Sequence, residues 1–359
     1  MNVGLMAKAI EGGLIRVDMA RIAMVVTNAC APDPRVERHA RWLVNDGHEV
    51  EILAWDRDGS MPPNETLSGY NIKRTNFGKN SKRSSLGTWM TKNKFISSLK
   101  IDADLLILND TDTADVRFNG KILLDIHDMA HTWPLMRGNS FVHKWAARSM
   151  LKQAKRIISK SDAIIVSAPG FADWIELQRL DPVVVMNRRN SQSLEKSQQK
   201  VLGYFGRIRE INSIRFMIQA AETAGFRIII AGDGDAVDSM LGEFPDLDYR
   251  GPFNEQQLPN LVEEISVMYA MYDPKRGNIM QGAIPTKMLD AAAFGRPSVV
   301  NANTPMGELC ESEGLGVTAD YGDVSKIAEA IEQAHSIEIT STKGEDNDAF
   351  LSVVNKLLN

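Results

Sequence analysis

The sequence predicts an α/β protein built from two tandem, doubly wound, Rossmann-like domains. Its 359 residues exceed what one hydrophobic core usually serves, and 43% hydrophobic with 24% charged residues is typical of a folded protein. Short β-rich runs alternate with helical patterns, which implies crossover connections and parallel sheets. The alternation pauses once, in a polar segment near the middle of the chain, and therefore forms two series.

The first series follows residues 1–18, which have no clear period and are interpreted as an extension. Buried strands are predicted at 21–27, 49–55, 103–108, 121–125 and 163–167. Helices are predicted at 35–45, 135–160 and 170–176. Together these elements predict an N-terminal domain over residues 1–190.

The second series begins after residues 190–200, a Ser- and Gln-rich segment with little to bury, which is the candidate linker. Strands are predicted at 201–205, 227–231, 267–272 and 297–301, and helices at 213–224, 256–263, 285–294 and 324–333. These define a C-terminal domain over 201–340, and apolar residues at helical spacing predict a closing helix within 341–359. Because ligands of open parallel sheets bind beyond the carboxyl ends of the strands, we expect the two domains to face a cleft.

Composition excludes several classes of protein. No apolar stretch approaches the ~18 residues of a membrane-spanning helix, and the N-terminus lacks an apolar signal core, so a cytoplasmic location is expected. Cys30 and Cys310 lie far apart and are expected to be free thiols, and no metal-binding cluster is evident. Residues 1–190 carry 27 Lys and Arg against 21 Asp and Glu, whereas residues 191–359 carry 14 against 25. The net charges of +6 and −11 indicate domains with different partners.

The most informative segment runs from Ile284 to Val300. Pro285 precedes one helical turn with Lys287 and Asp290 on a shared face. A cation in the first helical turn can join the free backbone N–H groups to hold a phosphate, and a carboxylate one turn further can accept both hydroxyls of a ribose. The segment therefore predicts a nucleoside-diphosphate site, with an exposed ion pair as the alternative.

A second segment, from Val201 to Glu210, ends a strand at Gly206 and presents Arg207 and Arg209. A guanidinium at the carboxyl end of a strand can hold phosphate oxygens, although a surface loop arginine is the alternative. The Gly-Asp-Gly run that ends at Gly234 resembles half of a dinucleotide fingerprint. We interpret these glycines as tight-turn residues, and no redox cofactor is predicted.

Several short motifs follow one another along both halves of the chain. In the C-terminal half they are Gly206-Arg-Ile-Arg-Glu210, Ile230-Ala-Gly-Asp-Gly234, Tyr249-Arg-Gly-Pro252, Tyr272-Asp-Pro274 and Pro285 to Pro297. In the N-terminal half they are Pro32 to Arg38, Gly47-His-Glu-Val50, Asn109-Asp-Thr-Asp-Thr113 and Asp125-Ile-His-Asp128. Over about residues 19–335, the order of these motifs resembles that of family 4 retaining glycosyltransferases of the GT-B fold.

The resemblance implies a C-terminal domain that binds a nucleotide-sugar donor. It implies that Arg207 holds the diphosphate beside Lys287, and that Asp290 stands where the family has the glutamate that contacts the ribose. The donor-binding candidates are Arg207, Arg209, Asn212, Gly234, Lys287 and Asp290. The chain departs from the family where Asn212 replaces a usual lysine and Gly282 replaces the earlier glutamate of a paired motif. The glycine pair common in the first loop is also replaced, by residues 29–33.

The resemblance also implies an N-terminal domain that binds the acceptor. Retaining transfer on this fold needs stabilisation of the departing diphosphate, here assigned to Arg207 and Lys287, and an oriented acceptor hydroxyl. His127 resembles the histidine that contacts the donor sugar, with a backbone-bonded histidine at a helix entry as the alternative. The acceptor-side candidates are Asp33 and Arg35 in the first loop, and Asp110 and Asp112 after a strand end. For Asp110 and Asp112, helix capping is the alternative role. No metal and no cofactor beyond the nucleotide-sugar co-substrate are implied.

Two stretches contain many cations and no acid. Residues 71–101 carry Lys73, Arg74, Lys79, Lys82, Arg83, Lys92, Lys94 and Lys100, interleaved with Phe77, Trp89 and Phe95. Residues 135–160 carry Arg137, Lys144, Arg148, Lys152, Lys155, Arg156 and Lys160 beside Phe141, Trp145 and Met150. Such stretches suit peripheral attachment to the anionic inner face of a membrane, while a solvated helix face or a groove for an anionic acceptor are alternatives. No motif that reads DNA or RNA accompanies them, so no nucleic-acid partner is predicted.

The resulting hypothesis is a glycosyltransferase that moves a sugar, with retention, from a nucleoside-diphosphate sugar to a hydroxyl of a glycan or lipid-linked acceptor. A nucleotide-sugar epimerase of the same fold would bind the donor without a second substrate. A noncatalytic scaffold subunit, which Asn212 and Gly282 would suit, would show no transfer.

Overall fold

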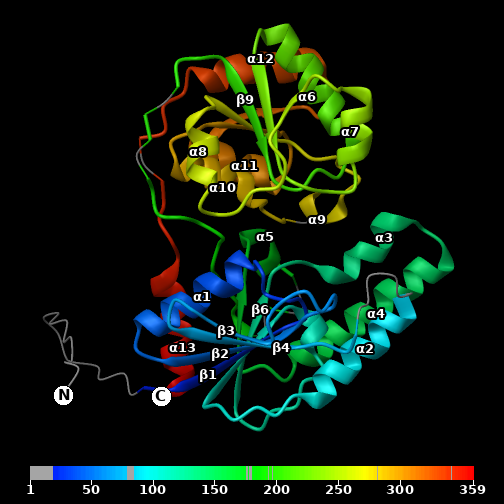
Figure 1. The fold of residues 1–359 in the computed structure, drawn as a ribbon, viewed down its shortest axis with the longest axis vertical. Coiled ribbons are helices and arrows are strands. Elements are labelled where there is room, and N and C mark those ends of the chain that lie inside the picture. Colours follow the sequence, from blue (N-terminus) through cyan, green and yellow to red (C-terminus); the bar gives the residue numbers. More distant parts are fainter. Residues whose placement is uncertain are drawn as a thin grey trace, which may run out of the picture. The chain divides into compact units, whose positions relative to one another are not determined.

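The structure is a computed structural model that describes residues 19–78, 85–174, 177, 180–192, 194–195, 197–280, 282–340 and 342–359. The extension predicted over residues 1–18 lies outside this described part. The chain folds into two compact units. One comprises the described residues up to Asn109, with Asp115–Leu123 and Leu351–Asn359, and the other comprises Asp110–Ala114 and Leu124–Phe350. Both contain helices and strands (Figure 1).

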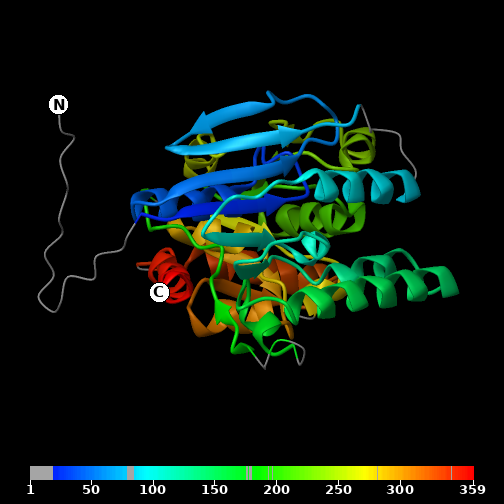
Figure 2. The same ribbon diagram turned by 90° about the horizontal axis from the view of Figure 1, so that it is seen from below.

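An eight-stranded sheet forms from the first half of the chain, in the order β3-β4-β2-β1-β5-β6-β7-β8. Its strands are β1 (Arg21–Val26), β2 (Glu49–Trp55), β3 (Asn64–Leu67), β4 (Tyr70–Thr75), β5 (Leu105–Asn109), β6 (Lys121–Ile126), β7 (Ala163–Val166) and β8 (Val183–Val184). β1 pairs in parallel with β2 and β5, and β2 pairs in parallel with β4. Figure 2 shows β1, β2 and β4 side by side. All of β1 after Arg21 is buried, because an unbroken apolar run suits a strand covered on both faces.

The helices of this half are α1 (Pro34–Asn45), α2 (Ser85–Ser98), α3 (Trp133–Arg137), α4 (Phe141–Ile158) and α5 (Pro169–Ala172), with 3₁₀ turns η1 (Thr111–Thr113) and η2 (Ala130–Thr132). The single helix predicted over 135–160 is wrong, since α3 ends before α4 begins. Ser140 separates them: its extended backbone leads into α4, and its side chain accepts a hydrogen bond from the backbone N–H of His143. The predicted helix over 170–176 is short, and residues 175 and 176 lie outside the described part.

The sequence reasoning missed the β3–β4 hairpin and α2. β3 has no buried residue, so its sequence carries no apolar alternation, and it pairs antiparallel with β4. In α2, Phe95 and Ile96 are buried while Trp89 and Met90 are exposed. Apolar residues spread around a helix leave no single apolar face for a periodicity argument to detect.

The second half of the chain forms a six-stranded, wholly parallel sheet in the order β11-β10-β9-β12-β13-β14. Its strands are β9 (Val201–Phe205), β10 (Arg227–Ala231), β11 (Asp248–Tyr249), β12 (Val267–Ala270), β13 (Ser298–Asn301) and β14 (Gly316–Ala319). Its helices are α6 (Ile211–Ala224), α7 (Val237–Glu243), α8 (Leu258–Glu263), α9 (Gly277–Met280), α10 (Thr286–Ala293), α11 (Pro305–Ser312) and α12 (Val324–His335). Alternate strand residues enter two buried clusters, Ile230 with Tyr269 in one and Phe205 with Ile229 in the other. The prediction of two parallel-sheet, Rossmann-like folds is confirmed.

The polar segment 190–200 is tied to the second sheet by a buried arginine. Arg296, which follows α10, is fully buried and donates to the backbone oxygens of Leu194 and Glu195. It also donates to the backbone oxygens of Val262, Ile265 and Phe294. One guanidinium thus satisfies carbonyl groups from several chain segments, and the candidate linker is held along this part of its length.

The C-terminal helix α13 (Asn347–Leu358) forms as the apolar spacing predicts. Phe350 and Val354 are its fully buried residues. Within the described residues, no helix is both long and apolar enough to cross a bilayer. The free, buried thiols of Cys30 and Cys310 agree with the prediction of no disulfide.

Candidate functional site

Four basic side chains gather where β9 and β12 end and α10 begins. Arg207 and Arg209 follow β9, Arg276 follows β12, and Lys287 lies in the first turn of α10. They are close enough to influence one another: Arg276 and Arg207 both lower the pKa of Arg209, and Arg276 and Arg209 both lower the pKa of Lys287. Clustered positive charges at the carboxyl ends of parallel strands are an arrangement suited to a phosphate-bearing ligand.

Arg276 was not among the sequence-based candidates. Its side chain is largely buried, with an exposed fraction of 14%, and its Nε lies 3.4 Å from Oε1 of Glu210. The guanidinium also lies over the ring of Tyr272, 5.5 Å from the centroid. The sequence feature that could have identified Arg276 is its position two residues after the motif Tyr272-Asp-Pro274, which lies at the end of a predicted strand.

Lys287 is the most unusual member of the cluster because it is 8% exposed and its Nζ makes no hydrogen bond within the described residues. Nζ lies 3.1 Å from the ring centroid of Tyr204 and 5.2 Å from that of Tyr272. Burial lowers the pKa of Lys287 well below its ordinary value, and the positive charges of Arg276 and Arg209 lower it further against the opposing effect of Glu210. A buried amine without an acceptor is costly for the folded state, which suggests that a ligand is its partner.

Arg207 is only weakly engaged. Half of its side chain is exposed, and its nearest carboxylates are Asp233 at 3.9 Å and Asp235 at 3.8 Å. These distances are at the outer limit of an ion pair, and exposed pairs contribute about 0–1 kcal/mol. The guanidinium is therefore available to a ligand at little cost.

Gly234 lets two loops pack backbone against backbone beside this cluster. The backbone N–H of Ile208 donates to the oxygen of Asp233 at 2.7 Å. A Cβ on Gly234, whose φ is +144°, would lie 2.0 Å from the oxygen of Ile208. No other residue fits such a gap, which agrees with the interpretation of Gly234 as a tight-turn residue.

Asp290 lies on α10, but its carboxylate is already engaged. Arg189, from the segment that follows β8, donates from Nε to Oδ1 of Asp290 and from NH2 to Oε1 of Glu255 at 3.0 Å. Asp290 and Arg189 have side-chain exposures of 17% and 18%. The residue predicted to contact a ribose, Asp290, is therefore paired with Arg189. Arg189 lies outside residues 284–300, so the spacing of residues within that segment could not reveal the pair.

The two departures from the family pattern have local explanations. Asn212 lies at the exposed start of α6 and accepts a hydrogen bond from Arg215 through Oδ1 at 2.7 Å. Gly282 has a φ of +114°, a backbone conformation that glutamate rarely adopts. The backbone at residue 282 thus disfavours the glutamate that the family usually has there.

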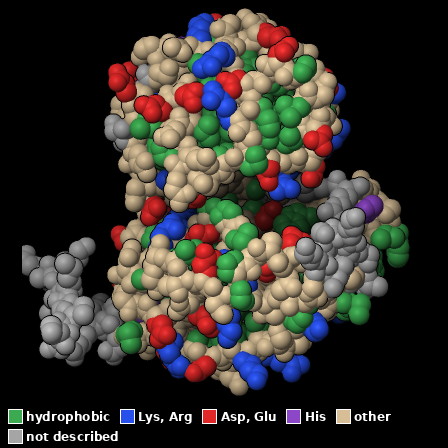
Figure 3. Space-filling view, viewed as in Figure 1, with side chains coloured by type: hydrophobic (Ala, Val, Ile, Leu, Met, Phe, Trp, Pro, Cys, Tyr) green, Lys and Arg blue, Asp and Glu red, His purple; other side chains and the backbone are tan. Residues whose placement is uncertain are grey.

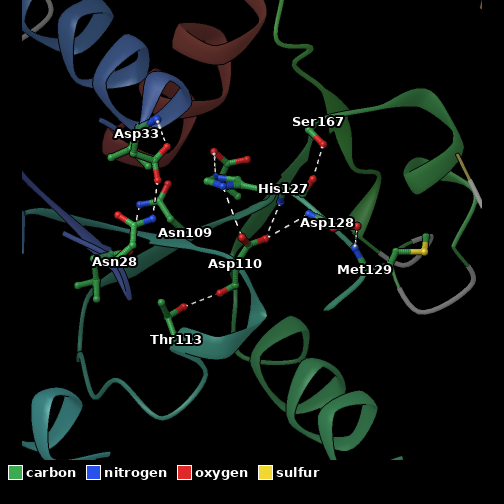
Figure 4. Close-up of polar contacts among 12 residues, drawn as sticks. Asn28, Asp33, Asn109, Asp110, Thr113, His127, Asp128, Met129 and Ser167 are labelled. Carbon is green, nitrogen blue, oxygen red and sulfur yellow. Dashed lines mark hydrogen bonds and ion pairs between the residues drawn. The ribbon is translucent and has the colours of Figure 1, made fainter. Parts of the chain in front are cut away.

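A second polar cluster lies at the carboxyl ends of β5 and β6. His127 is placed between two carboxylates: its Nε2 is 3.0 Å from Oδ2 of Asp125, and its Nδ1 is 3.5 Å from Oδ2 of Asp110. Asp125 is fully buried, whereas the side chains of His127 and Asp110 are 18% and 25% exposed. Figure 4 shows Asp110 turned toward both the ring and the backbone of His127. Because each ring nitrogen faces a carboxylate, the orientation of the imidazole ring of His127 is fixed, and so is the direction of its accessible edge.

Asp110 carries backbone strain and an elevated pKa. Its φ and ψ of 65° and 161° lie in a region that non-glycine residues seldom occupy. The conformation is held because Oδ1 accepts from the backbone N–H groups of His127 at 2.7 Å and Asp128 at 3.3 Å. Burial raises the pKa of Asp110 to about 7, with a further increase from Asp112 and an opposing effect of His127. A strained carboxyl that titrates near neutral pH is a candidate for a functional group.

The other acceptor-side candidates have structural roles. Asp33 caps α1: its Oδ1 accepts from the backbone N–H of Val36 at 3.3 Å, and its Oδ2 accepts from Asn28 at 2.8 Å. Arg35 lies in the first turn of α1 and is buried. Asp112 lies in η1, one residue before Thr113, whose hydroxyl donates to the backbone oxygen of Asp110. Asp33 is therefore a helix cap, whereas Asp110, for which capping was the alternative, makes no side-chain cap hydrogen bond to η1.

The C-terminal half also matches a known family in sequence. Residues 199–336 match the family described as "Glycosyl transferases group 1". This range contains the cluster of Arg207, Arg209, Arg276 and Lys287 in full. No curated protein matches the sequence.

Solved structures of glycosyltransferases have the same fold as the whole chain. Sucrose-phosphate synthase from Thermosynechococcus elongatus is 15% identical with a TM-score of 0.69, covering 94% of this chain and 95% of the other. HepE from Anabaena, in complex with UDP and glucose, is 14% identical with a TM-score of 0.63, covering 94% and 99%. TarM from S. aureus is 11% identical with a TM-score of 0.64, covering 95% and 100%. At these identities the likeness concerns the fold.

The family match and the fold agree with the geometry of the basic cluster. A parallel sheet that presents cations at its carboxyl edge is the expected form of a nucleotide-sugar site. The prediction of a glycosyltransferase is confirmed at this level: residues 199–336 match the glycosyl transferases group 1 family, and the fold is that of GT-B structures.

Proposed function

We propose that the protein is a retaining, family 4 glycosyltransferase that moves a sugar from a nucleoside-diphosphate sugar to a hydroxyl of a glycan or lipid-linked acceptor. The observation that carries the proposal is the cluster of three arginines around Lys287, a buried amine that has no hydrogen-bond partner within the described residues. A diphosphate would supply acceptor oxygens to these groups, each charge-assisted hydrogen bond contributing about 1.5–3 kcal/mol.

The donor is assigned to this cluster. Arg207 and Arg209 would hold one phosphate from the end of β9, and Arg276 and Lys287 the other. Asp290 is proposed to contact the ribose together with Arg189, which fixes the direction of the carboxylate. UDP is the first nucleotide to test, because the similar structures of HepE and TarM contain UDP.

The acceptor is assigned to the cluster of Asp110 and His127. Asp110 would orient the attacking hydroxyl, and His127 would contact the donor sugar through its accessible edge. Retention is supported by the similarity to trehalose-6-phosphate synthase, described as carrying out glycosyl transfer with retention, at 11% identity and a TM-score of 0.58. Transfer requires a state of the molecule in which both clusters contact the same donor.

The proposal is tested by thermal unfolding of the protein with a panel of nucleoside diphosphates and their sugars. A ligand at 100 times its dissociation constant is expected to add about 2.7 kcal/mol to the free energy of unfolding. The best donor is then incubated with glycan and lipid-linked acceptors, and the stereochemistry of the product is read by NMR. If no nucleotide raises the midpoint temperature of thermal unfolding, the donor assignment is wrong.

The same assay separates the two alternative functions. An epimerase would convert the donor with no acceptor present. A scaffold subunit would bind the nucleotide weakly and transfer no sugar to any acceptor. The exposed Asn212 and the glycine at position 282, where the family has a glutamate, would suit such a subunit.

We further propose that α4 attaches the protein to an anionic membrane at the inner face. Phe141, Val142 and Trp145 are 79%, 68% and 63% exposed at its start. The exposed cations along the same helix are Lys144, Arg148, Lys152, Lys155 and Arg156. In Figure 3, hydrophobic side chains gather at the right edge, where Figure 1 places the turn between α3 and α4. Aromatic side chains beside basic ones suit the interface of an anionic bilayer.

The other basic stretch contributes less to such a surface than its composition predicts. Arg74 is buried, donating to the backbone oxygens of Ala29, Cys30 and Pro62. Phe95 is buried in the core, stacked on Trp55. Lys79, Lys82 and Arg83 lie outside the described residues.

Vesicle binding tests the membrane proposal. Changing Phe141 and Trp145 to serine is expected to release the protein from phosphatidylglycerol vesicles, because both the apolar contact and the interfacial aromatic are lost. Co-sedimentation measures this. The control is Trp89→Ser on α2, whose side chain is 56% exposed outside α4 and which is expected to retain binding. Equal sedimentation of wild type and the α4 variant would contradict the assignment.

A further inference from the structure

This inference rests on the proposed donor site and concerns the charge state of Lys287. The side chain enters from the first turn of α10 and passes beside the end of β9: a Cβ on Gly206 would lie 3.1 Å from Cε of Lys287. The amine therefore ends immediately beside the backbone that leads to Arg207, on the face of Tyr204. Any phosphate bound by Arg207 at the end of β9 would lie near this amine.

The groups around the amine are mainly positive. The loop after β9 contributes Arg209 and Glu210, and the loop after β12 contributes Arg276. Glu210 is the favourable neighbour of an ammonium, yet its Oε1 is also paired with Arg276 at 3.4 Å. One shared carboxylate therefore faces several cations, which leaves the electrostatic environment unfavourable for a further positive charge.

The ring of Tyr204 does not replace a hydrogen-bond acceptor. The attraction of a desolvated cation to an aromatic face is weaker than the cost of withdrawing an ammonium from water. A neutral amine can also direct an N–H toward the ring. The contact is thus compatible with an uncharged Lys287.

We propose that Lys287 is a neutral amine in the ligand-free protein and takes up one proton from solvent when the donor diphosphate binds. In this reaction the amine nitrogen gains an N–H bond, and the resulting ammonium donates to a phosphate oxygen. The diphosphate supplies further negative charge and a hydrogen-bond acceptor for the amine.

The coupling makes donor affinity depend on pH in a defined direction. Because the complex binds one more proton than the free components, affinity falls as pH rises, by about tenfold per pH unit between the pKa of Lys287 in the free protein and in the complex. The charged groups that face Lys287 are Arg209, Arg276 and Glu210. Arginine side chains in general do not titrate between about pH 7 and 9. Burial raises the pKa of Glu210 above its ordinary value of 4.5.

The charge state is tested first without ligand. Below the ordinary pKa of lysine, the unfolded state binds a proton at residue 287 that the folded state does not, so this residue costs folding stability, and the cost declines as pH rises. As pH rises, the unfolding equilibrium constant of wild type is expected to fall relative to that of Lys287→Met by about tenfold per pH unit. Wild type therefore gains stability relative to the variant, and this gain ends near pH 10.5, the ordinary pKa of lysine. Lys326→Met, which removes an exposed lysine paired with Asp320, is the control and is expected to give a flat difference between about pH 7 and 9.

Proton uptake is then measured by titration calorimetry at one pH in two buffers of different ionisation enthalpy, with UDP and with pyrophosphate as probes. Close to one proton per bound ligand is expected for wild type and for Lys326→Met, and none for Lys287→Met. Binding without proton uptake, or a flat stability difference in the first experiment, would overturn the coupling and leave the donor site intact. Failure of both probes to bind would overturn the donor site and the coupling together.

Discussion

Changing Arg207 and Arg276 together to alanine is expected to weaken binding of the nucleoside diphosphate by about 100-fold or more. Each guanidinium can contribute a charge-assisted hydrogen bond of about 1.5–3 kcal/mol, and loss of both corresponds to at least two factors of ten in the dissociation constant. Arg207 is half exposed and weakly paired, so its removal should cost little folding stability. Titration calorimetry measures the affinity, and thermal unfolding verifies that the variant is folded.

The matched control for this double variant is Arg215 with Arg227, also changed to alanine. Both are partly exposed arginines of the same parallel-sheet fold, paired with Glu243 and Asp248. Their removal subtracts the same net charge at positions outside the cluster. A loss of affinity as large as that of the Arg207 and Arg276 variant would show that net charge, and not the assigned site, governs binding.

Asp110→Asn is expected to reduce transfer by about two to three orders of magnitude with unchanged donor affinity. Asparagine can still accept the hydrogen bonds from the backbone N–H groups of His127 and Asp128, so the strained backbone is retained. It cannot accept a proton or present a negative charge to the acceptor hydroxyl. Initial rates at saturating donor, with affinities from calorimetry, separate the two effects.

Folding stability gives a second readout for Asp110. Because the pKa of Asp110 is raised from 3.8 to about 7 in the folded protein, the folded state retains a proton that the unfolded state releases, and stability is lost as pH rises through this window. Asp110→Asn does not titrate and is expected to be more stable than wild type by about 1–3 kcal/mol at pH 8, with a small difference near pH 4. A constant difference across this range would contradict the elevated pKa, and full activity of the variant would remove Asp110 from the acceptor assignment.

Strands β9 and β10 of the second sheet were predictable because each is a local, apolar and buried run of residues. Val201–Phe205 and Arg227–Ala231 match the expected ranges residue for residue, since continuous apolar runs between turn residues suit parallel strands covered on both faces. The place of Arg207 at the end of β9 follows from the same pattern. In contrast, α3 and α4 were merged, because apolar periodicity continues across a break set by the cap of Ser140.

The partners of the site residues were not predictable in the same way. Asp290 and Arg189 are 101 residues apart, and no period or spacing connects them. Arg276 is drawn into the cluster by Glu210, from a different strand end. Arg74 was counted as a surface cation because composition does not reveal burial, and the fold instead uses it to satisfy backbone oxygens.

The sequence by itself determined the parallel-sheet architecture and the strand ends at which the candidate side chains stand. These follow from burial patterns and turn residues, which act over a few residues of chain. Only the tertiary structure decided that Lys287 has no hydrogen-bond acceptor among the described residues, that Asp110 is strained and that Asp290 is paired with Arg189. The charge state and the partners of these side chains depend on their burial and on neighbouring charges. Folding sets both by bringing together residues from distant parts of the chain.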